Sequence, residues 1–199
     1  MLDTHAETVP DRRPAIVICA YDVSESGWNP VDGSSGLPWD PVGGRTIPVA
    51  AADPQTLAST LTARLMEPGC RALLLVGRTR HGDAFRIQMR AENRALDGTA
   101  RLDLTGPCSA RATAPVAEIV EAMNEAGLTA QASSDYEDDA GNYLLYRILS
   151  DLPDGADSPA VSLIRAPATV SDAELQRGVQ TAAATMARHL SPLPRSTQT

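Results

Sequence analysis

The sequence predicts an α/β fold: a three-layer sandwich with a central mixed, mostly parallel sheet and helices on both faces. Three continuous apolar runs, Ala15–Tyr21, Ala72–Gly77 and Ala160–Ile164, are typical of strands buried on both faces. Segments with helical periodicity stand between such runs, and this alternation favours helices packed against both sides of one sheet.

The remaining elements are predicted by local signals in chain order. Residues 22–45 are rich in Gly, Pro, Ser and Asp and predict a long irregular loop, a kind of segment that is often functional. Further strands are predicted at 46–50, 85–89 and 129–133, with short extended pieces over 91–112. Helices are predicted from Pro54 to Pro68–Gly69, from Pro115 to Gly127, from about 141 to 152, and from the capping box Ser171–Glu174 to about Leu190.

The length and the ends of the chain predict one domain. The chain has 199 residues, which is enough for a single core without stabilising disulfides. We expect a flexible leader over 1–14, a single α/β domain over 15–190 and a disordered tail over 191–199.

Composition excludes several classes of protein. All 17 basic residues are Arg, so there is no lysine for a Schiff base, a pyridoxal phosphate enzyme or a Walker A loop. The net charge of −8 argues against a nucleic-acid surface. The three cysteines and three histidines are widely spaced, so neither a metal site nor a cofactor is expected. No apolar run is long enough for a membrane span, and a cytoplasmic protein is the default expectation.

Four motifs lie where the predicted strands lead into loops. Ala20–Pro30 is similar to G-F-[ED]-P-F-G-G-x-x-x-N-P, and Ile87–Asn93 is similar to V-E-R-x-A-x-N. Ser134–Tyr146 resembles S-[ND]-x-A-G-x-[YF]-x-C-N-Y-x-x-Y, and Ile164–Pro167 resembles a strand that ends in H-x-P. In this order and spacing, over about residues 15–190, they resemble the pyroglutamyl peptidase type I (pyrrolidone-carboxylate peptidase) family of cysteine peptidases, which remove N-terminal pyroglutamate.

The residues that carry catalysis in that family are all changed here. Its nucleophilic Cys falls on Gly141, its general-base His on Arg165 and its orienting Glu on Gln88. Glycine has no side chain to attack an amide carbonyl, and arginine stays protonated at neutral pH. The resemblance therefore implies the fold without the cysteine-peptidase mechanism.

The same alignment of motifs yields candidate ligand-binding residues. Tyr21 and Ser24 match the two phenylalanines that enclose the lactam ring in the family, and the loop after Gly77 brings Arg and His side chains to the site. The candidates are Tyr21, Ser24, Arg78, His81, Asn142 and Arg165. Arg165 has two interpretations, namely a fork that binds a carboxylate or phosphate, or an ion pair with the acidic run 137–139.

Three functions remain open from the sequence. The first is a non-peptidase homologue that binds a small carboxylate or amide ligand, peptide-like ligands included, or a partner. The second is an enzyme of changed chemistry, such as a hydrolase, cyclase or isomerase acting on a small amide or carboxylate. The third is a structural subunit that pairs with an active paralogue. The resemblance also implies a homo-oligomer, a dimer or a tetramer.

Overall fold

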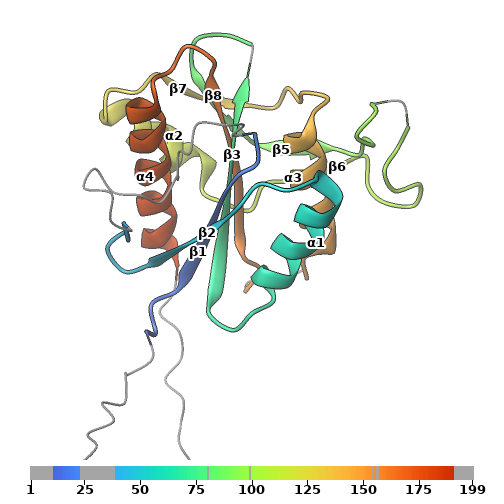
Figure 1. Ribbon diagram of the computed structural model, residues 1–199, viewed down its shortest axis with the longest axis horizontal. Coiled ribbons are helices and arrows are strands. Elements are labelled where there is room, and N and C mark those ends of the chain that lie inside the picture. Colours follow the sequence, from blue (N-terminus) through green and yellow to red (C-terminus); the bar gives the residue numbers. More distant parts are fainter. Residues whose placement is uncertain are drawn as a thin grey trace, which may run out of the picture.

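A six-stranded mixed sheet forms the middle layer of the protein (Figure 1). The computed structural model describes residues 11–22, 39–79, 81–98, 100–153, 155 and 157–190. Residues 1–10 of the expected leader, residues 23–38 of the expected loop and the expected tail 191–199 therefore lie outside the described residues. Among the described helices, none is long and apolar enough to cross a membrane.

The strand order in the sheet is β2-β1-β3-β8-β4-β7. The strands are β1 (Ala15–Ala20), β2 (Arg45–Val49), β3 (Cys70–Thr79), β4 (Phe85–Gln88), β7 (Ala130–Ser133) and β8 (Ala160–Pro167). Every neighbouring pair is parallel except β4 and β8, which run antiparallel. The predicted mixed, mostly parallel sheet is therefore confirmed.

Two helices cover each face of this sheet, so the predicted three-layer architecture is also confirmed. The helices are α1 (Pro54–Leu65), α2 (Val116–Glu125), α3 (Ala140–Asp151) and α4 (Asp172–His189). Alternate β1 residues point to opposite faces. Ile16 and Ile18 join the core under α2 and α4, whereas Val17 and Cys19 join the core under α1 and α3.

Two helices, α1 and α4, begin at the residues that the capping signals predict. Asp53 caps α1 by accepting a hydrogen bond from the Thr56 backbone N–H, ahead of Pro at the first helical position. Ser171 and Glu174 form the predicted capping box of α4. The α3 helix is capped by Asp139, whose Oδ1 accepts from the Asn142 backbone N–H at 2.9 Å.

The region expected to hold short extended pieces contains a separate antiparallel ribbon. Its strands are β5 (Arg90–Glu92) and β6 (Ser109–Arg111). The strand predicted at 85–89 ends at Gln88, and the chain then leaves the main sheet for this ribbon. The ribbon lies on the α3 side of the sheet, where the buried Ala91 joins the core under α3.

Part of the expected leader is tied to the folded domain. The Arg13 guanidinium pairs with Asp40 at 2.8 Å and donates a hydrogen bond to the Gly44 carbonyl at 3.0 Å. The Pro14 carbonyl accepts from the Arg45 backbone N–H at 3.0 Å, beside the β1–β2 pairing. Residues 11–14 are therefore joined to the segment that leads into β2.

Candidate functional site

The three positions that match the family triad meet at one end of the sheet. Arg165 lies near the carboxyl end of β8, opposite Gly77 on β3 and Arg86 on β4. Gln88 follows Arg86 two residues later and so faces the same side of the sheet. The first turn of α3, which contains Gly141, starts on that side. The carboxyl edge of parallel strands is the usual location of sites in such sheets.

Arg165 is fully buried and paired with an acidic residue of the same site. Its side chain has 0% exposed surface. Nη2 donates to Asp139 Oδ1 at 2.7 Å, and Nη1 donates to Asp139 Oδ2 in a very short contact, so the pair is bidentate. Of the two interpretations of Arg165, the described contacts are those of the ion pair with the run 137–139.

A second arginine and a second carboxylate extend this pair. Arg86 Nη1 donates to Glu137 Oε1 at 3.2 Å, and Glu137 Oε1 also lies 3.8 Å from Arg165 Nε. Thr79 Oγ1 donates to the same oxygen at 2.7 Å. We call Arg86, Glu137, Asp139 and Arg165 the buried ion network. The four named groups carry two positive and two negative charges, and the exposed Asp135 carboxylate adds a further contact to Arg86 at 3.5 Å.

The space beside Gly141, the residue that the motif aligns with the family's nucleophile, is filled by Tyr21. A Cβ at Gly141 would overlap the Tyr21 hydroxyl oxygen, would lie 2.7 Å from Tyr21 Cζ and would lie 3.2 Å from Arg165 Nη2. A Cβ at Gly77, on the opposite side of the tyrosine, would overlap the same hydroxyl. Tyr21 therefore fits between two glycines, and its hydroxyl accepts a hydrogen bond from Arg165 Nη1 at 3.4 Å.

Gln88, which the motif aligns with the family's orienting Glu, hydrogen-bonds to backbone carbonyls. It is buried, and its Nε2 donates to the Arg90 carbonyl at 3.0 Å and to the Asp135 carbonyl at 2.8 Å. Its Oε1 has no hydrogen-bond partner among the described residues, and neither has Arg165 Nε. Gln88 thus holds the turn after β4 against the loop that follows β7.

The other candidate residues are mostly engaged within the protein. The Arg78 guanidinium donates to the Pro167 and Val170 carbonyls and pairs with Asp172 at 3.1 Å. The Asn142 side chain pairs with both backbone groups of Glu92. His81 is exposed, and Ser24 lies outside the described residues. Of the described candidates, only His81 makes no side-chain hydrogen bond at all among the described residues.

The protonation states at this site suit structure rather than acid–base catalysis. Burial raises the pKa of the Tyr21 hydroxyl well above its ordinary value, so the phenol stays neutral. Burial is the largest single influence on Arg165 and opposes its charge, but the hydrogen bond to Asp139 and the charges of Asp139 and Glu137 act together with Tyr21 to raise the pKa of the guanidinium. Neither group can exchange a proton near neutral pH. No group of three His, Cys, Asp or Glu residues in the described part of the chain could hold a metal ion.

Arg86 is the member of the network that sequence reasoning missed. The alternation over 85–89 predicts a strand, but it does not by itself assign the polar residues of that strand to a site. The sequence does contain a signal for Arg86. Residues 86 and 88 face the same side of the predicted strand, and the family motif assigns Gln88 to the site.

The cysteines lie away from this site and differ in accessibility. Cys19 is buried in β1, and burial raises the pKa of its thiol to about 12. Cys70 is also buried, with its pKa raised by the same cause, whereas Cys108 is exposed. Because the thiolate is the reactive form, the two buried thiols are protected.

Titration with a chromogenic disulfide reagent at pH 8 should therefore modify one thiol in the native protein and three in denaturant. The Cys108→Ser variant should show no fast-reacting thiol in the native state. Rapid native reaction of a second thiol would contradict this assignment.

Solved structures with the same fold include several peptidases. A pyrrolidone carboxyl peptidase from Thermus thermophilus superposes with a TM-score of 0.67 at 19% identity, covering 86% of this chain and 99% of that chain. Pyroglutamyl peptidase I from Bacillus amyloliquefaciens gives 0.70 at 16% identity, covering 88% and 98%. A mutant pyrrolidone carboxyl peptidase from Pyrococcus furiosus gives 0.71 at 15% identity, covering 88% and 99%.

No protein-family model and no curated protein sequence matches the chain. The structural similarity nonetheless spans nearly the whole of each peptidase. It confirms the fold that the four motifs predict, which is that of the pyrrolidone carboxyl peptidases. At this level of identity it shows the fold alone, so any function must be argued from the residues of this chain.

Proposed function

We propose that this chain is a non-peptidase homologue of the pyroglutamyl peptidases, which binds a small carboxylate- or amide-bearing ligand or a partner. The observation that carries the proposal is the filling of the triad position. Tyr21 occupies the space beside Gly141 where a nucleophile would stand, and Arg165 stands where the base would be. Neither side chain can perform the step that its counterpart performs in the family.

The buried ion network supports a structural role for the former catalytic centre. Arg165 has no exposed surface, and its charge is compensated by Asp139 and Glu137. An incoming carboxylate would have to displace an internal one that is already bound in a bidentate fork. Binding by this protein is therefore assigned to surfaces outside the network.

The proposal extends to assembly and location. We expect a homo-oligomer, either a dimer or a tetramer, that acts in the cytoplasm. Size-exclusion chromatography with light scattering measures the oligomeric state, and fractionation of cells carrying the native gene measures the location.

The direct test of the proposal is hydrolysis of a fluorogenic pyroglutamyl amide by the purified protein. We expect no release of fluorophore above the rate in buffer, because nucleophile and base are both absent. An active pyrrolidone carboxyl peptidase under the same conditions provides the positive control.

Turnover that persists through purification and is abolished by Arg165→Gln would overturn the proposal. Turnover that is unchanged by Arg165→Gln and by Tyr21→Phe would indicate a contaminating peptidase. The wild-type rate is then measured again on protein purified through a different affinity tag.

A further inference from the structure

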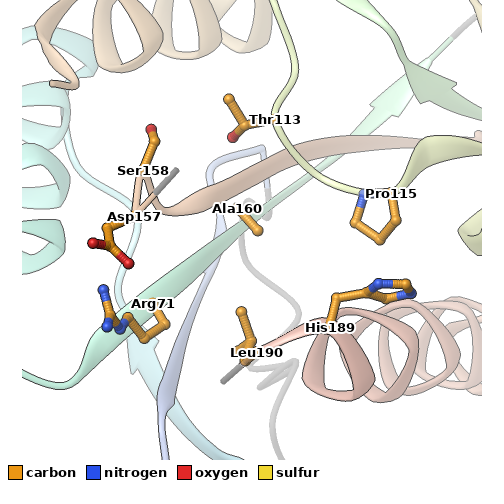
Figure 2. A pocket seen from close by; sticks show the side chains of 8 residues that line it. All are labelled: Arg71, Thr113, Pro115, Asp157, Ser158, Ala160, His189 and Leu190. Atoms are coloured by element: carbon orange, nitrogen blue, oxygen red, sulfur yellow. The ribbon is translucent and has the colours of Figure 1, made fainter. Parts of the chain in front are cut away.

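A second candidate site lies at the opposite edge of the sheet from the buried ion network. A cavity of about 280 Å³ opens there, beside Arg71 at the start of β3 and Ala160 at the start of β8 (Figure 2). Ala160 precedes Arg165 by five residues on the same strand, which separates the two positions by about 16 Å. We call this cavity the amino-edge pocket.

The amino-edge pocket contains two opposite charges that are not used inside the protein. Figure 2 shows the Arg71 guanidinium and the Asp157 carboxylate on the same side of the pocket, directed toward each other. Neither side chain has a hydrogen bond or an ion pair among the described residues. Ser158 also lines the pocket, but its hydroxyl points away from these two charged groups. Arg71 can therefore bind an anion while Asp157 accepts from a cation.

The remaining wall of the pocket is partly apolar. Pro115, ahead of α2, and Leu190, at the end of α4, line it together with His189. His189 Nε2 is already engaged with Glu118 Oε2, which lies on α2 outside the pocket lining. The volume is close to the lower limit of pockets that hold small molecules, roughly 300 Å³. The space suits a small ligand with a short apolar portion.

We propose that the amino-edge pocket binds a zwitterion of the α-amino acid type with a small apolar side chain. Arg71 donates in a fork to the ligand carboxylate. Asp157 accepts from its ammonium group, and the ligand side chain lies against Pro115 and Leu190. A simple anion would leave Asp157 unused and would lie close to its negative charge, so the zwitterion is the better match to the charges.

This inference goes beyond the proposed function, and the two can fail separately. Hydrolysis of a pyroglutamyl amide would overturn the non-peptidase assignment and leave the pocket untouched. If no zwitterion binds, the proposal that the amino-edge pocket binds amino acids is overturned, whereas the non-peptidase proposal is unaffected.

The experiment is a calorimetric titration of the full chain with l-leucine, l-valine and l-alanine up to about 10 mM. Two analogues of leucine isolate its charges: 3-methylbutylamine lacks the carboxylate, and 4-methylpentanoate lacks the ammonium. Inorganic phosphate tests simple anion binding. We expect at least one amino acid to bind and, if it is leucine, both analogues to bind at least tenfold more weakly. For valine or alanine, the matching amine and carboxylate replace these analogues.

Substitutions then assign each charge to its ligand group. Arg71→Gln should weaken amino-acid binding at least tenfold but should not change the binding of the amine analogue. Asp157→Asn should also weaken amino-acid binding at least tenfold but should not change the binding of the carboxylate analogue. Arg177→Gln and Asp83→Asn are matched controls on exposed residues outside the pocket, and they should bind as the wild type does. Thermal unfolding without ligand should be alike in all five proteins, since the substituted side chains are at least partly exposed.

The proposal is overturned if none of the three amino acids binds, or if phosphate or the carboxylate analogue binds as tightly as the amino acid. Binding that survives both Arg71→Gln and Asp157→Asn would place the ligand elsewhere and would equally overturn it.

Discussion

Replacement of Arg165 by alanine is expected to lower the free energy of unfolding by about 3 kcal/mol. Removal of one partner from a buried ion pair costs about 3–5 kcal/mol, because the other charge is left without compensation. The lower end applies because the Asp139 side chain is 30% exposed and can regain some water, whereas Glu137 is 13% exposed and regains less. A loss of this size is a large part of the total stability of an ordinary domain, about 5–15 kcal/mol.

Urea denaturation at neutral pH measures this loss through the transition midpoint and the slope. Arg177→Ala is the matched control, because Arg177 is exposed and should cost no more than about 0.5 kcal/mol. Asp139→Asn offers a milder change, since asparagine still caps α3 but no longer neutralises Arg165. Its destabilisation should lie between those of Arg177→Ala and Arg165→Ala. Equal stabilities for Arg165→Ala and Arg177→Ala would show that the network contributes nothing.

Gly141→Cys, which introduces the residue type that the motif alignment places at this position in the family, is expected to destabilise the protein and to leave it inactive. The new Cβ would overlap the Tyr21 hydroxyl and lie 2.7 Å from Cζ, so the tyrosine must move. Overpacking of this kind costs about 1–3 kcal/mol. Gly141→Ala should show nearly the same loss, although alanine elsewhere in a helix gains up to about 1 kcal/mol over glycine.

A double-mutant cycle with Tyr21→Ala separates this overlap from other effects. In the Tyr21→Ala background, Gly141→Ala should be neutral or stabilising, because its Cβ then has space. Tyr21→Phe should relieve less of the strain, since Cζ remains near the new Cβ. Destabilisation by Gly141→Ala that is the same in both backgrounds would contradict the packing described here. The triple variant that combines Gly141→Cys with Arg165→His and Gln88→Glu should still not hydrolyse a pyroglutamyl amide while Tyr21 is present.

The layers of the fold could be predicted from the sequence, but the neighbours within the sheet could not. Continuous apolar runs such as Ala72–Gly77 show that a strand is buried on both faces, and the capping box at Ser171 shows where a helix begins. Neither signal states which strands pair. The placement of β8 between β3 and β4, with β4 reversed, depends on contacts between residues far apart in the chain.

The motifs name residues for the candidate site but do not give their arrangement. The motifs place Gln88, Gly141 and Arg165 at one site, and the acidic run 137–139 is the alternative partner that the sequence offers to Arg165. Which alternative holds depends on the direction of the α3 N-terminus, which only the folded chain defines. Tyr21 was expected to line a pocket. Its place between two glycines follows from side-chain volume in three dimensions, which one-dimensional spacing does not contain.

The position of β8 in the strand order has a consequence for how the chain acquires its structure. The strands before it can form only two separate pieces, β2-β1-β3 and β4-β7, because β3 and β4 do not pair with each other. These pieces are joined only when residues 160–167 insert between them. During synthesis, the inner edges of β3 and β4 carry unpaired backbone groups until the residues of β8, 160–167, have emerged. Such late, non-local closure is slow and exposes strand edges that can aggregate, so we expect this chain to fold slowly for its size.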